Sequence, residues 1–194
     1  MKSTSKMTFS ILLACMAWLA PAAVLAHPHL LDVKDRIEVS PEVMLDDLRK
    51  AQVIFVGELH DNPGHHQAQL AIIDALDNDE TPLAIGLEMF RRDSQEDLDV
   101  WTAGSSSVSE FMQAFNNNWG MWPVYSGIFM HARNENVKMV GLNIPRSITG
   151  KVARNGYKSL SNEERLLLGN VQCEVDQAYA DYIRQAMGGH GGHG

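Results

Sequence analysis

The chain has 194 residues, with 24 acidic against 16 basic side chains and a formal net charge of −8 at pH 7. An acidic surface disfavours nucleic acid and anionic lipid as partners, because both present phosphate groups. Cations and small ligands remain as the classes to consider. The length suits one domain with its own packed core.

Residues 1–26 predict an export signal. Lys2 and Lys6 precede the apolar run ILLACMAWLAPAAVLA, and small or short side chains favour cleavage after Ala26. A second interpretation treats LLAC, residues 12–15, as a lipobox in which a lipid on Cys15 would anchor the protein to a membrane. Pro21 interrupts the apolar run, which argues against a membrane-spanning helix.

Cleavage would leave 168 residues, and loss of the two leader lysines would take the net charge to −10. Cys173 would then be the only cysteine, so no internal disulfide is expected in an oxidising compartment. After a linker at 27–40, an α/β domain is predicted over 41–187, followed by a flexible glycine- and histidine-rich tail at 188–194.

Three short apolar runs predict buried parallel strands: VIFVGE (53–58), LAIGLE (83–88) and VKMVGLN (137–143). Apolar residues at helical spacing lie between them, around 69–76, 108–115 and 125–132. The predicted order is β-α-β-α-α-β, so the fold class is α/β, with a mainly parallel sheet of at least three strands flanked by helices.

The part after the third run is predicted to be helical only. Ser161 and Glu164 form a capping box, and Gly169 ends that helix. A stripe of apolar and tyrosine residues then repeats at helical spacing from Val175 to Ala186. Such a stripe is usually core.

Each predicted strand ends in a polar residue, namely Glu58, Glu88 and Asn143. In open parallel sheets ligands bind beyond the carboxyl ends of the strands, so these side chains are expected to converge on one crevice. His60 lies two residues after Glu58, which would point both side chains the same way along an extended chain.

Glu58, His60 and Glu88 together offer ligands suited to a divalent transition metal, which could activate water for hydrolysis. His65 and His66 follow Pro63 in the first turn of a helix, where the dipole favours neutral rings. The alternative is that the carboxylates cap helices and that these two histidines are solvated.

A second group of residues lies between 143 and 160. Lys151, Arg154 and Lys158 have the spacing of one helical face, and Tyr157 stands beside them. A tyrosinate can ligate ferric haem iron, and basic groups can hold the haem propionates. The alternative is a solvated basic face with a packed tyrosine.

Other histidines and tyrosines are less specific. His131 is expected to be a structural histidine, and Tyr179 and Tyr182 could be core residues or ligands. His27, His190 and His193 could bind metal, or could belong to unstructured ends.

Four segments, GELHD (57–61), AIGLEMF (84–90), GLNIPR (141–146) and SLSNEER (159–165), together resemble the ChaN family of the haem-binding uptake/Tiki superfamily. The resemblance implies an α/β fold, export to the periplasm or a membrane face, haem binding for iron uptake, and a homodimer served by an outer-membrane haem uptake system. It also implies that the chain is truncated at its carboxyl end, because family members continue further.

The leading hypothesis is an exported haem-binding protein rather than an enzyme. The candidate haem-binding residues are Tyr157, Lys151, Arg154, Tyr182 and His190. One alternative is a metal-dependent hydrolase that uses Glu58, His60 and Glu88. Another is a partner-binding fragment that needs a second subunit to complete its sheet.

Overall fold

The computed structural model describes residues 29–77, 82–169 and 176–186. It divides into two compact units, residues 1–50 and 51–194. The predictions for the signal, Cys15, His27, Cys173, His190, His193 and the glycine-rich tail lie outside the described residues. None of the helices within the described ranges combines the length and the hydropathy needed to cross a bilayer.

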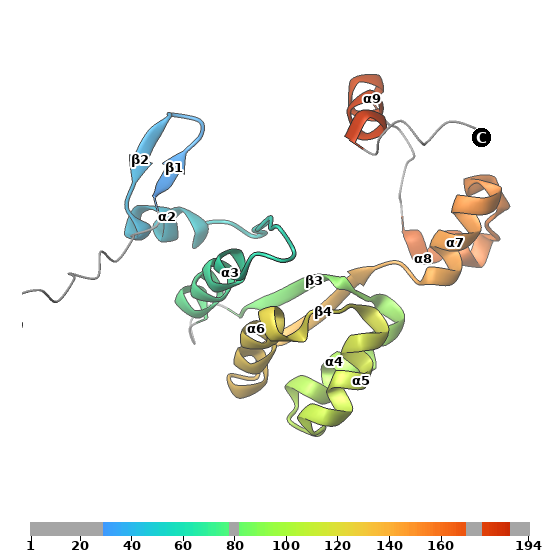
Figure 1. The fold of residues 1–194 in the computed structure, drawn as a ribbon, viewed down its shortest axis with the longest axis horizontal. Helices are drawn as coiled ribbons and strands as arrows, with labels where there is room; N and C mark the ends of the chain where they lie inside the picture. The colour runs from blue at the N-terminus through green and yellow to red at the C-terminus, as the bar shows by residue number, and fades with distance from the viewer. Residues whose placement is uncertain (1–28, 78–81, 170–175, 187–194) are drawn as a thin grey trace, which may run out of the picture. The chain divides into compact units, whose positions relative to one another are not determined.

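In its described residues, 29–50, the first unit forms a β-hairpin followed by a helix (Figure 1). Strands β1 (Leu30–Asp32) and β2 (Ile37–Val39) pair antiparallel, within the stretch expected to be a linker. The turn between them is shaped by Asp32, whose side chain accepts hydrogen bonds from the backbone of Lys34 and Asp35. Helix α2 (Pro41–Leu48) begins after Ser40, whose hydroxyl caps it.

Over the residues that the structure describes, the second unit alternates helices with strands. In chain order its elements are α3 (Pro63–Leu76), β3 (Ala84–Arg91), η1 (Arg92–Ser94), α4 (Gln95–Thr102), α5 (Val108–Asn118), α6 (Trp122–Asn134), β4 (Lys138–Asn143), α7 (Arg146–Asn155), η2 (Tyr157–Ser159), α8 (Asn162–Leu168) and α9 (Gln177–Ala186). The three helices predicted between the apolar runs are therefore confirmed as α3, α5 and α6, and the helical carboxyl-terminal part is confirmed as well.

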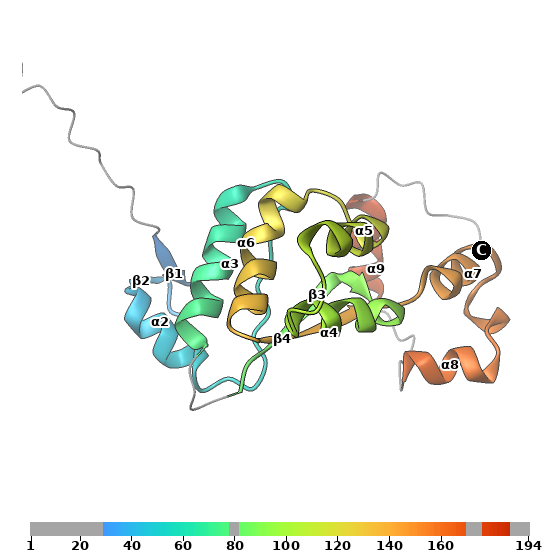
Figure 2. The ribbon, with the colours of Figure 1, turned by 90° about the horizontal axis from the view of Figure 1, so that it is seen from below.

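Strands β3 and β4 form a parallel pair, connected by α4, α5 and α6. These three helices lie on one side of the strands (Figure 1), and α3 lies beside α6 (Figure 2). Because helices cover one face, burial alternates along β3: Ile85 and Leu87 are buried, whereas Gly86 and Glu88 are exposed. An aromatic core fills the space between sheet and helices, and its largest fully buried side chains are Trp101, Tyr125, Phe90, Phe115 and Phe129.

The predicted third strand at 53–58 is not confirmed, since the parallel sheet has two strands within the described part of the chain. The side chains of Val53 and Phe55 are 68% and 93% exposed. An apolar run becomes a buried strand only where a neighbouring strand completes its hydrogen bonds and another layer covers it. The residues of the run itself say little about whether a neighbouring strand is present, and nothing about whether another layer covers it.

A smaller apolar cluster joins α7, the segment after η2 and the end of α8. Ile148, Leu160 and Leu168 are buried, and Tyr157 packs against them. The predicted capping box is confirmed: Ser161 accepts from the backbone of Glu164, whose carboxylate accepts from the Ser161 amide. Gly169 has φ of 66°, a left-handed conformation that glycine adopts at low cost, and it ends α8 as expected.

Candidate functional site

The loop before α3 places a group of polar side chains against α6. Asn62 accepts a hydrogen bond from the Gly64 amide at 2.9 Å, and Pro63 occupies the first helical position, so α3 begins at once. His65 and His66 therefore fall in its first turn, as the sequence predicts. His66 is buried, so the expectation that both rings are solvated does not hold.

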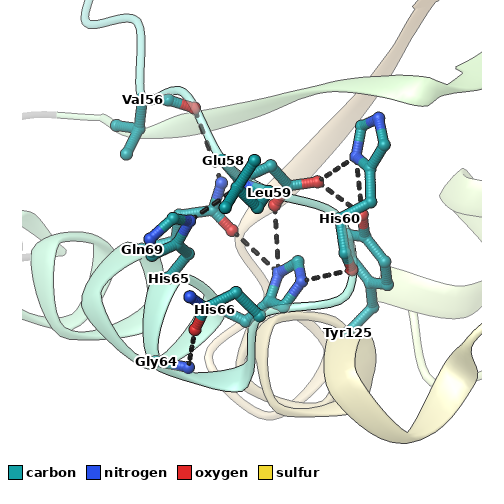
Figure 3. Close-up of polar contacts among 10 residues, drawn as sticks. Val56, Glu58, Leu59, His60, Gly64, His65, His66, Gln69 and Tyr125 are labelled. Atoms are coloured by element: carbon teal, nitrogen blue, oxygen red, sulfur yellow. Dashed lines mark hydrogen bonds and ion pairs between the residues drawn. The ribbon is translucent and has the colours of Figure 1, made fainter.

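Glu58 is the centre of this group (Figure 3). Its Oε1 atom accepts hydrogen bonds from the Tyr125 hydroxyl and from His60 Nδ1, the latter at 2.8 Å. Its Oε2 atom lies 3.0 Å from His66 Nδ1. Only 11% of the Glu58 side chain is exposed, so a carboxylate from an irregular segment is held inside the molecule by three side chains.

The charge state of this carboxylate follows from two opposing effects. Burial penalises the ionised form of Glu58, but hydrogen bonds from Tyr125 and His60, with the electrostatic pull of His66, outweigh it and lower the pKa of the carboxyl group. Burial raises the pKa of the Tyr125 phenol, and the Glu58 carboxylate raises it further. Tyr125 is thus a neutral donor and Glu58 an ionised acceptor.

His66 fixes the loop in place. Its Nε2 atom donates to the His60 carbonyl at 3.0 Å, and its ring packs on that of Tyr125 with centroids 4.2 Å apart. The amide of Leu59 donates to His65 Nδ1 at 2.8 Å. Both imidazoles of the first turn therefore hold backbone groups of residues 59 and 60 (Figure 3).

His60 differs from its two neighbours because 51% of its side chain is exposed. Its ring meets the edge of Trp119, with centroids 5.0 Å apart. Within the described residues, its Nε2 atom has no hydrogen-bond partner, whereas its Nδ1 atom is held by Glu58. This leaves a nitrogen lone pair facing outward.

Two buried polar atoms in this group make no hydrogen bond with the described residues: Glu58 Oε2 and Trp119 Nε1. His66 Nδ1 approaches Glu58 Oε2 at ion-pair distance without hydrogen-bond alignment. Unsatisfied buried groups are uncommon in native proteins and concentrate where a protein has a function.

Glu88 lies exposed on β3, and its charge contributes to raising the pKa of Tyr125, so it acts on the same group as Glu58. Asn143, at the end of β4, instead binds the adjacent backbone amide of Ile144. Among the described residues, no three His, Cys, Asp or Glu side chains gather in a way that could hold a metal ion. The predicted divalent metal site is not supported.

Sequence reasoning missed two arginines near the carboxyl ends of β3 and β4, because no local pattern marks them. Arg91 ends β3 and donates to the Asn117 carbonyl at 3.0 Å, and Arg146 begins α7 and donates to the Asn118 carbonyl at 3.5 Å. Both guanidinium groups thus gather at the carboxyl end of α5, where the helix dipole attracts cations. Trp119 follows directly and contacts His60.

The basic residues predicted on one helical face are divided. Gly156, at φ of 75°, ends α7 after Asn155, so Lys158 lies in η2 instead of on the helix with Lys151 and Arg154. Lys151 forms an ion pair with Glu164 at 2.7 Å. Arg154 is exposed and, within the described residues, has no ion-pair partner.

The four tyrosines occupy different surroundings. Tyr125 is fully buried, and Tyr157 is partly buried, with the Arg165 guanidinium 5.7 Å from its ring centre. Tyr179 and Tyr182 are 60% and 66% exposed on α9, so the stripe of that helix is not a core face among the described residues. His131 donates to Asp77 Oδ2 at 3.1 Å, which confirms a structural role.

Comparison with known proteins identifies the family. A family model described as haem-binding uptake, Tiki superfamily, ChaN matches residues 44–194. The solved structure "Cofacial heme binding to ChaN of Campylobacter jejuni" is 26% identical, with a TM-score of 0.60, over 82% of this chain. This chain spans 63% of the length of that protein. No curated protein matches this chain. The chain belongs to the ChaN family of the haem-binding uptake/Tiki superfamily.

Proposed function

We propose that this protein binds haem and takes part in haem or iron uptake. The observation that carries the proposal is family membership over residues 44–194, together with a structural relative that binds haem cofacially. The acidic surface agrees with a small ligand, since it disfavours phosphate-bearing macromolecules. Haem is the cargo, so no catalytic residue is assigned.

The surroundings of the tyrosines favour Tyr182 as the ligand of ferric haem iron. A tyrosinate ligand must be accessible and able to lose its proton. Tyr125 meets neither condition, because it is buried and donates to Glu58, which raises its pKa. Tyr157 is partly covered by Arg165, whereas Tyr182 is exposed on α9.

Arg154 is the better propionate partner of the two basic residues proposed on α7. Its guanidinium is exposed and free of ion pairs with the described residues, whereas Lys151 is engaged by Glu164. An arginine also matches the planar geometry of a carboxylate with two parallel hydrogen bonds. His190 remains a proposed partner from the sequence alone.

We infer that the protein works outside the cytoplasm. The support is residues 1–26, in which two lysines precede an apolar stretch and a cleavage site. The mature chain would then lie in the periplasm, or at a membrane if Cys15 is lipidated. A homodimer supplied by an outer-membrane haem uptake system is part of the same proposal.

Haemin titration of the mature protein, followed through the Soret band, tests this function. A saturable shift at micromolar haemin is expected, and Tyr182→Phe should weaken it by at least about tenfold. Tyr179→Phe is the matched control, because Tyr179 is equally exposed on the same helix and should leave the spectrum unchanged. The absence of a saturable shift in the wild-type protein would contradict the proposal.

A further inference from the structure

The imidazole of His60 has the arrangement of an oriented metal ligand. An ionised Glu58 carboxylate accepts hydrogen bonds and cannot donate them. His60 Nδ1 therefore carries the proton of the hydrogen bond that joins the two side chains at 2.8 Å. The lone pair of the neutral ring then lies on Nε2. A carboxylate behind a histidine ligand fixes its tautomer and raises its basicity.

The neighbouring histidines lack this arrangement. The Leu59 amide donates to His65 Nδ1, so the lone pair of that ring is already engaged. His66 is buried, and its Nε2 donates to the His60 carbonyl. Of these three imidazoles, only His60 combines an outward lone pair with an exposed ring.

The ring of His60 is held on several sides before any ligand arrives. Trp119 contacts its edge, Glu58 binds its Nδ1, and His66 holds its backbone carbonyl. Glu58 is in turn bound by the buried Tyr125 on α6. A ligand whose supporting groups are themselves fixed loses little conformational entropy on binding.

The surroundings suit haem better than a bare cation. A bare zinc ion takes three or four protein ligands, and no such group exists among the described residues. Haem iron needs only an axial ligand from the protein, since the porphyrin supplies four nitrogens. Leu59, 62% exposed, and Trp119 offer apolar contact beside His60.

A cation suited to a propionate binds the carbonyl group that precedes Trp119, the residue that contacts His60. Among the described residues, Arg146 donates only to the Asn118 carbonyl and has no carboxylate partner. Asn118 directly precedes Trp119 in the sequence. Arg91 reaches the adjacent Asn117 carbonyl but is paired with Asp93 at 3.3 Å. Arg146 is therefore the freer of the two.

We propose that His60 coordinates haem iron through Nε2, held by Glu58, with Arg146 as a propionate partner. The proposal rests on haem binding by this protein and adds an imidazole ligand to the tyrosinate considered above. The two ligands differ in their preference for iron. A tyrosinate oxygen favours ferric iron, whereas a neutral imidazole binds ferrous iron as well.

The test compares wild-type mature protein and variants with haem, first as ferric haemin and then after reduction with excess dithionite under nitrogen. The wild-type protein should keep haem on reduction, with an iron–histidine stretching band in resonance Raman spectra. His60→Ala should lose that band and bind ferrous haem at least about tenfold more weakly. Added imidazole should restore the spectrum of His60→Ala.

His29→Ala is the matched control. His29 also binds a carboxylate through Nδ1, Glu38 at 2.6 Å, and is exposed, but it lies in the first unit and contacts no aromatic ring of the described residues. It should leave both spectra unchanged. Glu58→Gln should shift the iron–histidine band without removing it, and Arg146→Ala should weaken haem binding in both oxidation states and leave the band in place.

The outcomes separate this proposal from the proposed function. Haem binding by the wild-type protein with an unchanged ferrous spectrum in His60→Ala would overturn the ligand assignment and leave the function standing. Failure of the wild-type protein to bind haem would overturn both. Circular dichroism of each variant checks the fold, and His60→Gln provides a second variant that retains a polar side chain.

Discussion

The group around Glu58 in the loop before α3 and the basic segment from α7 to α8 were both candidate sites, and their charged side chains have different kinds of partners. Around Glu58, residues far apart in the sequence bury one carboxylate, and two buried polar atoms there make no hydrogen bond within the described part of the chain. Along α7 and α8, Lys151 is neutralised by Glu164, and Tyr157 packs on an apolar cluster.

This difference teaches that a charge pattern along one helix is weak evidence for a site. The partner of Lys151 is the same glutamate that caps the next helix, so a local stabilising role accounts for both residues. Glu58, in contrast, is held by a hydroxyl 67 positions away in the sequence. Convergence of that kind has no local explanation.

The largest effect that separates the two regions should come from their tyrosines. Tyr125→Phe removes a buried donor to an ionised carboxylate and should lower the free energy of unfolding by about 2 kcal/mol. Tyr157→Phe removes a hydroxyl that makes no hydrogen bond with the described residues, so less than about 0.5 kcal/mol is expected. Urea denaturation of both variants measures the difference, and equal losses would remove the distinction.

A smaller effect should appear in the pH dependence of stability. The pKa of Glu58 is lowered in the folded protein, so its ionised form stabilises the fold above the ordinary glutamate pKa of about 4.3. That contribution is lost as the pH falls through the lowered pKa. Denaturation curves between about pH 6 and about pH 3 should therefore show a smaller loss of stability in Glu58→Gln than in the wild-type protein. An identical acid dependence would contradict the assignment.

The smallest effect is expected at the ion pair of the basic segment. The Lys151 ammonium, followed by the Ser161 amide, lowers the pKa of the Glu164 carboxyl group. Lys151→Ala should raise that pKa toward its ordinary value, which an NMR titration of the Glu164 side chain would follow. Arg154→Ala should leave it unchanged, because that arginine has no ion pair with Glu164. If the pKa of Glu164 were the same in Lys151→Ala as in the wild-type protein, the ion pair would be absent and the lysine would be free to bind a ligand.

Much of the secondary structure could be read from local patterns. The periodicity at 69–76, 108–115 and 125–132 predicted α3, α5 and α6, and Ser161 with Glu164 predicted the start of α8. Capping and periodicity depend on residues three or four positions apart, so the sequence displays them directly. The exposed run at 53–58 shows the limit, because its pairing depends on distant partners.

The sequence by itself determined the alternation of helices with strands β3 and β4, the starts of α3 and α8, and the closeness of Glu58, His60 and His66 along the chain, because each depends on neighbouring residues. Only the tertiary structure decided that Tyr125 holds Glu58, that Trp119 contacts His60 and that Arg91 and Arg146 share the end of α5. The physical reason is that a buried charge must be satisfied by whichever donors the packing brings near, and no local rule encodes which ones these are.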